Sequence, residues 1–182
     1  MIAALFVASD GPYVGLPGVD AWDVERDARK YRGPHRVVAH PPCKRWGNYW
    51  YGSPSGPERF TLGDDDGCFA SALWAVRTFG GVIEHPENSR AWEWFGLPRP
   101  SHIGWGWSNQ RDHYNGRSCA VAQGRYGHPS RKMTWLYAVL PQFPSMDWRD
   151  CANMKPVEHL DKRERFITPL PFRDALIEMV SQ

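Results

Sequence analysis

The fold class of this chain is decided by the stretch Arg36-Val37-Val38-Ala39-His40-Pro41-Pro42-Cys43. Its apolar residues predict a buried strand over 36–39, and the paired prolines that follow cannot donate hydrogen bonds to a sheet ladder. The strand therefore ends at His40. Polar and reactive side chains stand directly at its C-terminal end.

The same arrangement recurs further along the chain. Apolar residues at helical spacing predict a helix over about 66–79, preceded by the acidic residues 64–66 that suit the positive end of a helix dipole. Gly80-Gly81 ends this helix, Val82-Ile83 predicts a short strand, and Glu84-His85-Pro86 follows. In open α/β sheets ligands bind beyond the carboxyl ends of the strands, so we expect the two polar strand ends to share one cleft.

Other segments complete an α/β pattern. The predicted strands cover residues 2–8, 21–24, 119–123 and 134–139, and a closing helix covers 172–180. The Gly/Pro/Tyr/Trp-rich segment 46–57 is too irregular for either element and predicts a functional loop. We therefore expect a single domain over residues 1–182, with irregular segments rich in tryptophan and glycine.

Composition narrows the class of protein. The formal net charge of +2 among 182 residues gives no general nucleic-acid signature. No apolar run reaches the length of about 20 residues that a membrane helix needs, and the N-terminal run has no basic leader. The four cysteines are far apart and form no CxxC pair, which favours a cytoplasmic setting. Most of the ten tryptophans are expected to fill the core.

Three short motifs occur in an order that resembles a known family. They are Pro41-Pro42-Cys43, Glu84-His85-Pro86 and Gln123-Gly124-Arg125. The order and the placement at strand ends are similar to those of the cytosine-C5 DNA methyltransferases, in the abbreviated form common among bacteriophage and prophage proteins. The resemblance spans almost the whole chain and implies a reduced, Rossmann-like methyltransferase-type core of three layers.

The resemblance implies a catalytic group. Cys43 would attack C6 of a pyrimidine, and Glu84 would assist at N3, which requires a raised pKa of that carboxyl group. Arg125 would hold the pyrimidine carbonyl or a phosphate, and Gln123 would orient the loop. His40, Lys44 and Arg45 are close in sequence and are expected to favour the thiolate.

The resemblance also implies S-adenosylmethionine as the cofactor. The residues that match its binding motif are Phe6, Asp10, Gly11 and Glu25, with Asp23 or Asp27 as the alternative acid. The turn from Val7 to Pro12 departs from the family pattern, because it carries side chains where the backbone should approach the cofactor closely.

DNA or a pyrimidine nucleotide is the expected partner. The residues predicted to contact it are His40, Arg45, Trp46, His128, Arg131 and Lys132. In a duplex the target base must be flipped out, and Trp46, Tyr49 or Trp50 would then stack on it or fill the gap. Packing of a proline-rich loop is the alternative role for these rings.

Other interpretations stay open at the level of sequence. Cys43 and Glu84 would also serve a different modification of a base or nucleotide, without S-adenosylmethionine. A third hypothesis is a catalytically silent module that binds nucleic acid or a host protein. A buried, inert Cys43 would agree with this hypothesis. A metal site built on His40-x-x-Cys43 with His85, His113 or Cys119 matches no familiar spacing.

Overall fold

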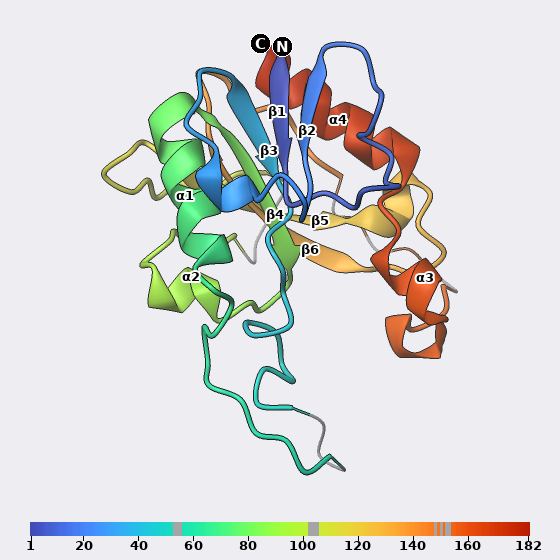
Figure 1. Cartoon of the computed structure of the whole chain (residues 1–182). Helices are drawn as coiled ribbons and strands as arrows, with labels where there is room; N and C mark the ends of the chain where they lie inside the picture. The colour runs from blue at the N-terminus through green and yellow to red at the C-terminus, as the bar shows by residue number, and fades with distance from the viewer. Residues whose placement is uncertain (53–55, 102–105, 148, 150, 152–153) are drawn as a thin grey trace.

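The computed structural model describes residues 1–52, 56–101, 106–147, 149, 151 and 154–182. Its centre is a six-stranded mixed sheet in the order β2-β1-β3-β4-β6-β5 (Figure 1). The strands are β1 (Ile2–Leu5), β2 (Val19–Trp22), β3 (Arg36–Ala39), β4 (Gly81–Pro86), β5 (Arg117–Ala122) and β6 (Met133–Val139). The first four run parallel, and β6 runs antiparallel to both of its neighbours.

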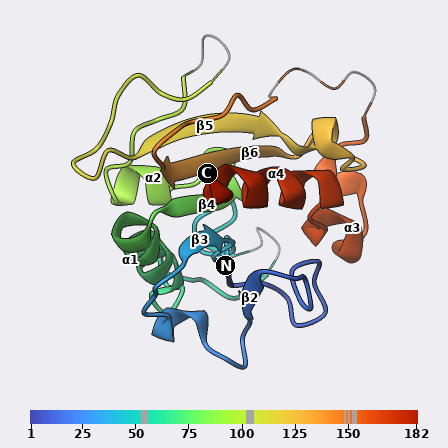
Figure 2. The same ribbon diagram turned by 90° about the horizontal axis from the view of Figure 1, so that it is seen from above.

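Helices cover both faces of this sheet. The longer ones are α1 (Cys68–Phe79) and α4 (Leu170–Ser181), and the short ones are α2 (Ala91–Trp94) and α3 (Lys162–Phe166). Single 3-10 turns occur as η1 (Ala28–Lys30), η2 (Gln123–Tyr126) and η3 (Val157–His159). Figure 2 shows α1 and α2 on one side of the sheet and α4 on the other. The described chain is therefore an α/β domain with three layers.

The apolar strands explain why the sheet is buried on both faces. Leu5, Val37 and Ile83 pack on the α1 side, while Val38 and Val82 pack on the α4 side. All five are fully buried, as expected for parallel strands between helical layers. The strand predicted over 36–39 is confirmed at its predicted bounds.

Some predicted bounds needed correction. The first strand ends at Leu5 and not at residue 8, because Phe6 adopts a positive φ of 58° that breaks the extended backbone. The second strand is Val19–Trp22, earlier than the predicted 21–24, and it pairs with β1 from Ile2 onward. The helix predicted from residue 66 begins at Cys68.

Gly81 sets the spacing between β3 and β4. Its φ is 137°, and a Cβ atom there would lie 2.0 Å from the carbonyl oxygen of Val37. Only glycine allows this approach. The sequence predicted only that Gly80-Gly81 ends the helix. Gly81 also allows β4 to pack closely against β3.

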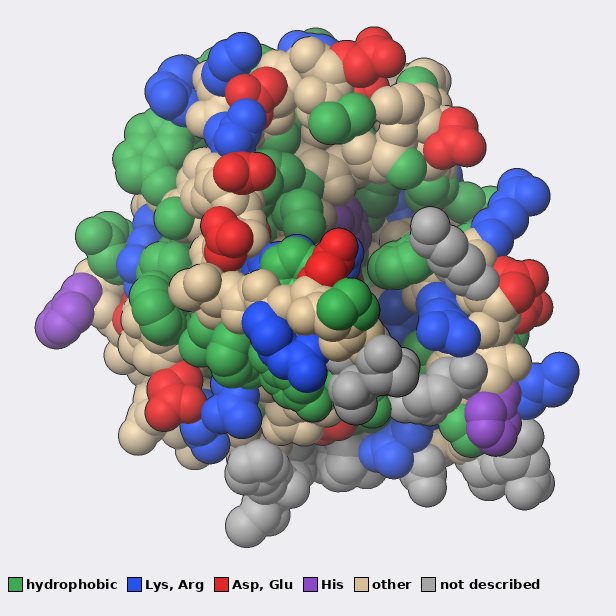
Figure 3. Space-filling view, turned by 60° about the horizontal axis from the view of Figure 1, so that its bottom comes forward, with side chains coloured by type: hydrophobic (Ala, Val, Ile, Leu, Met, Phe, Trp, Pro, Cys, Tyr) green, Lys and Arg blue, Asp and Glu red, His purple; other side chains and the backbone are tan. Residues whose placement is uncertain are grey.

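The carboxyl ends of the parallel strands lie at one end of the molecule. In Figure 1 both termini lie at the opposite end, and the segment between β3 and α1 extends away from the body beyond these carboxyl ends. Figure 3 views this end directly and shows a hollow with a histidine inside it and lysine and arginine side chains around it. The fold thus collects the residues that follow β1, β3 and β4 around one depression.

Candidate functional site

The loop after β3 places Cys43 at this end of the sheet. The carbonyl oxygen of Cys43 accepts hydrogen bonds from the backbone N–H groups of Trp46 and Gly47, both at 3.0 Å. Trp46 is buried and donates from its indole to Asp65, at 2.7 Å. Asp65 also accepts the N–H of Phe69 at the start of α1. The turn that carries Cys43 is therefore fixed to the first turn of a helix.

A hydrogen-bonded chain crosses the end of the sheet beside this turn. His40 Nδ1 lies 3.1 Å from Glu84 Oε2, and His40 Nε2 lies 2.9 Å from the hydroxyl of Tyr13. The His40 and Glu84 side chains are only 14% and 16% exposed, so water screens the pair weakly. Residues that follow β1 and β3 are thus joined to a residue of β4.

Gln123 completes the contacts of the carboxylate. Its Nε2 donates to Glu84 Oε1 and to Thr134 Oγ1, both at 2.9 Å. Its Oε1 is buried and has no hydrogen-bond partner among the described residues. Such a buried acceptor is costly unless a donor meets it, so a ligand with an N–H group would be favoured here. Both oxygens of Glu84 are held in place, and a free acceptor stands beside them.

Charges around Glu84 keep it ionised. Burial alone would raise the pKa of Glu84, but the hydrogen bond and charge of His40, with the charges of Lys132 and His85, lower it to about 2. The expectation of a raised carboxyl pKa is therefore wrong for the ligand-free protein. Glu84 is a hydrogen-bond acceptor in this state.

The thiol of Cys43 is neutral in the same state. Burial raises the pKa of Cys43, the charge of Glu84 raises it further, and Lys132 opposes this increase. The residues expected to supply positive charge do not: Arg45 lies over the ring of Phe60 at 3.3 Å from its centroid, and Lys44 faces the same ring. The cation beside Cys43 comes from Lys132, next to β6.

A separate cleft of about 270 Å³ opens at the carboxyl ends of β1 and β3. Phe6 and Val24 give it apolar walls, Asp23 and Asp27 give it carboxylates, and Pro42 closes it next to Cys43. The chain leaves β1 toward β2 on one side and β3 lies on the other, so this is a topological switch point, where α/β sheets bind ligands.

Of the predicted cofactor residues, only Phe6 lines this cleft. Asp10 and Glu25 are exposed, and Gly11 forms a turn with Ala8. The acidic residues that line the cleft are Asp23, Asp27 and Asp66, and the first two are the alternative acids named from the sequence. The carboxylate of Asp27 is held by Arg29 at 2.7 Å, and Oδ1 of Asp23 accepts the backbone N–H groups of Glu25 and Arg26, both at 3.1 Å.

The predicted nucleic-acid contacts are only partly brought to the site. His40 and Lys132 belong to it, whereas Trp46 and His128 are buried, so neither offers an accessible surface to a base or phosphate. His128 Nδ1 accepts the backbone N–H of Ser130, and its Nε2 donates to the backbone oxygen of Glu164, both at 3.1 Å.

Arginines predicted at the site lie elsewhere. Arg125 is exposed on η2 and its Nε donates to the backbone oxygen of Arg149 at 3.4 Å. Arg131 is exposed next to Lys132.

Sequence reasoning missed Tyr13 and Thr134. Tyr13 follows the turn after β1, and Thr134 stands at the start of β6, which runs antiparallel and so begins where β4 ends. A search for polar residues at every strand end on this side of the sheet, including starts of antiparallel strands, would have found both.

Comparisons of the chain with known protein families, with curated proteins and with solved structures find no match. Among the described residues, no helix is long and apolar enough to cross a membrane. The described part of the chain also contains no group of three or more His, Cys, Asp or Glu side chains placed to hold a metal ion. His85, one of the candidate ligands, is instead buried with its Nδ1 bonded to Ser89.

Proposed function

We propose that this protein is a DNA-modifying enzyme that acts on cytosine and resembles the cytosine-C5 methyltransferases. The observation that carries the proposal is the convergence of Cys43, Glu84 and Gln123. They come from three distant segments, and two of them are directly hydrogen-bonded. The helix-covered sheet with parallel β2-β1-β3-β4 and antiparallel β6 is compatible with a reduced methyltransferase-type core.

The protonation states of the site fit addition to a pyrimidine. The C5 carbon of cytosine becomes nucleophilic once sulfur adds to C6 and the ring gains a proton at N3. The resting site holds one proton on Cys43 and none on Glu84. In the proposed step the thiol proton passes to Glu84 and on to N3, while the sulfur–C6 bond forms. The C5–C6 π electrons then form the C4–C5 double bond, and the N3–C4 π electrons move to N3, which takes up the proton. Glu84 returns to its ionised state, so the protons balance.

Neighbouring residues hold this proton path in place. Gln123 fixes one carboxylate oxygen, and its free Oε1 is suited to accept from the exocyclic amino group of cytosine. His40 fixes the other oxygen and is itself held by Tyr13. A base that takes up the His40 contact would weaken the interaction that keeps the pKa of Glu84 low. Binding would therefore make N3 protonation easier.

Several side chains of the cleft next to Pro42 support S-adenosylmethionine as its ligand. Phe6 and Val24 would flank the adenine, Asp23 would accept from ribose hydroxyls, and Asp66 adds negative charge that suits a sulfonium. When bound, this cofactor would supply an electrophilic methyl group. A different donor in the same cleft would give a different product at C5. This is the alternative hypothesis of a modification without S-adenosylmethionine.

Expression in a bacterial strain tests the proposal. Digested DNA nucleosides from cells that express the wild-type protein, Cys43→Ala or Cys151→Ala are compared by mass spectrometry; Cys151 is a partly exposed cysteine on another segment and serves as the control. We expect 5-methyldeoxycytidine with the wild-type and control proteins only. A different new nucleoside mass that also depends on Cys43 would support modification of cytosine, with a group donor other than S-adenosylmethionine. Unchanged nucleosides in all three strains would count against activity on cellular DNA.

A further inference from the structure

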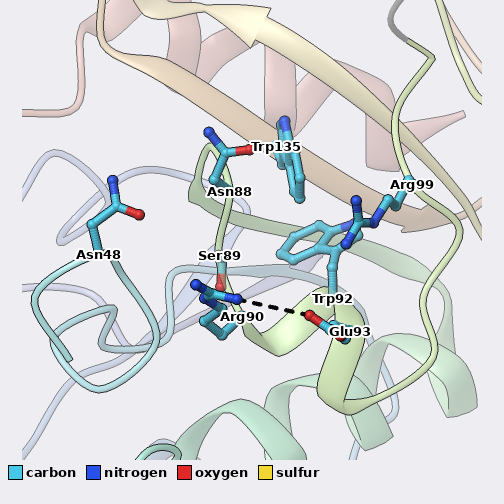
Figure 4. Close-up of a pocket in the computed structure, with 8 residues that line it drawn as sticks. All are labelled: Asn48, Asn88, Ser89, Arg90, Trp92, Glu93, Arg99 and Trp135. Atoms are coloured by element: carbon cyan, nitrogen blue, oxygen red, sulfur yellow. Dashed lines mark ion pairs between the residues drawn. The ribbon is translucent and has the colours of Figure 1, made fainter. Parts of the chain in front are cut away.

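A second pocket of about 270 Å³ opens beside α2, on the α1 side of the sheet. Three segments meet in it: the loop after Cys43 gives Asn48, the turn after β4 gives Asn88 and Arg90, and the chain after α2 gives Arg99. Figure 4 shows these polar side chains around the indole rings of Trp92 and Trp135.

The two indoles form a fixed apolar floor. Their ring centroids are 5.6 Å apart in an edge-to-face arrangement, and the two residues are 1% and 6% exposed. Trp92 donates from Nε1 to Ser118 at 2.9 Å, which holds the ring in one orientation. Trp92 is thus almost completely covered, and the small exposed part of Trp135 gives the bottom of the pocket an apolar contact.

The rim of the pocket offers polar groups that no other described residue engages. The side chains of Asn48, Asn88 and Arg99 have no hydrogen-bond or ion-pair partner within the described ranges. Arg90 and Glu93 form only a long, exposed ion pair at 4.0 Å. Glu93 therefore offsets the charge of Arg90, and the charge of Arg99 is left for a ligand.

This combination of groups matches one class of ligand. Amide side chains pair with the edges of bases, and guanidinium groups bind phosphates. The exposed part of Trp135 adds an apolar contact for a base, which can reach it only when the base is not stacked in a duplex. An unpaired nucleotide satisfies all three requirements.

The pocket lies at the same end of β4 as the proposed catalytic group. Asn88 is four residues beyond Glu84, and Asn48 is five residues beyond Cys43. Four fully extended residues span at most about 14 Å, which limits the distance between the Cα atoms of Glu84 and Asn88. Trp135 pairs with His85 in the ladder, one position from Glu84. The pocket and the side chain of Glu84 thus lie at the same end of β4, on opposite faces of the sheet.

We propose that this pocket binds the nucleotide next to the target cytosine in single-stranded DNA. The inference rests on the proposed function and specifies its substrate. Arg99 binds the phosphate, Asn48 and Asn88 contact the base edge, and Trp135 adds an apolar contact. An unpaired strand presents its bases without base flipping.

Binding measurements separate this inference from catalysis. A fluorescently labelled single strand of about 12 nucleotides with one cytosine is titrated with the wild-type protein and followed by anisotropy, at several salt concentrations. The variants are Arg99→Gln, Asn48→Ala and the control Arg163→Gln, an exposed arginine on α3. We expect the Kd to rise about tenfold for Arg99→Gln, with a salt slope smaller by about one, and about threefold for Asn48→Ala. The control should stay within about twofold of the wild type.

Several results would overturn the inference. They are no binding of the strand by the wild-type protein, equal binding by all variants, or equal Arg99 dependence with a duplex of the same sequence. The proposed function is judged separately by Cys43-dependent modification of cytosine. If the wild-type protein modifies cytosine but Arg99→Gln binds the strand as tightly as the wild type, the proposed function stands and the proposed role of this pocket is refuted.

Discussion

Replacement of Glu84 by glutamine should remove a large part of the acid sensitivity of the fold. In the folded protein the pKa of Glu84 is about 2, compared with an ordinary value of 4.5. At about 1.36 kcal/mol for each pH unit, this difference corresponds to about 3.4 kcal/mol of stability carried by the ionised form. Because the folded-state pKa is depressed, this stability is present above about pH 4.5 and is lost as the pH falls toward about 2.

The measurement compares the free energy of unfolding in urea at about pH 6 and about pH 3.5, where linkage predicts a loss of about 1.4 kcal/mol from Glu84 alone. Other acidic groups titrate in both proteins, so their effect cancels in the difference. Glu84→Gln should therefore lose about 1.4 kcal/mol less than the wild type over this interval. Glu178→Gln, an exposed carboxylate on α4, is the control and should follow the wild type. Parallel curves for Glu84→Gln and the wild type would refute the reasoning.

Two further changes test the surroundings of the site. Lys132→Met removes the cation that opposes the raised pKa of Cys43, so alkylation of Cys43 by iodoacetamide, followed by mass spectrometry, should shift to higher pH. An unchanged pH profile would show that Lys132 does not act on the thiol. Asp65→Asn weakens both the start of α1 and the anchor of Trp46, and should cost about 1–2 kcal/mol in urea unfolding. A loss no larger than that of Asp64→Asn, the exposed neighbour, would contradict this role.

The sequence predicts those parts of the fold in which local patterns and tertiary packing agree. The strand before His40 has apolar residues and a proline stop, and it has the predicted bounds. The first strand failed at Phe6, where the apolar run continues but the backbone turns to a positive φ. Hydrophobicity alone cannot show such a turn. The α/β class followed from alternation of elements, whereas the strand order depends on contacts between distant segments.

The candidate site shows the same division. The Cys43 and Glu84 positions could be predicted because each directly follows or ends a strand. The partners of these groups could not, since Tyr13 and Lys132 approach from segments far away in the chain. Trp46 has the residue type of a base-stacking group, but burial against Phe69 decides its role. Residue type indicates what a side chain can do, and packing determines which of these roles is open to it.

Hydrogen exchange at C5 of cytosine tests the central claim without any cofactor. Addition of Cys43 to C6 makes C5 basic, so in D₂O this carbon should exchange its hydrogen for deuterium each time the addition reverses. Single-stranded DNA is incubated in D₂O with the wild-type protein, Cys43→Ala or Cys151→Ala, then digested, and deoxycytidine is analysed by mass spectrometry. The account predicts deuterium at C5 with the wild-type and Cys151→Ala proteins and none with Cys43→Ala. Exchange that persists in Cys43→Ala, or a wild-type protein that binds the strand but never exchanges this hydrogen, would contradict it.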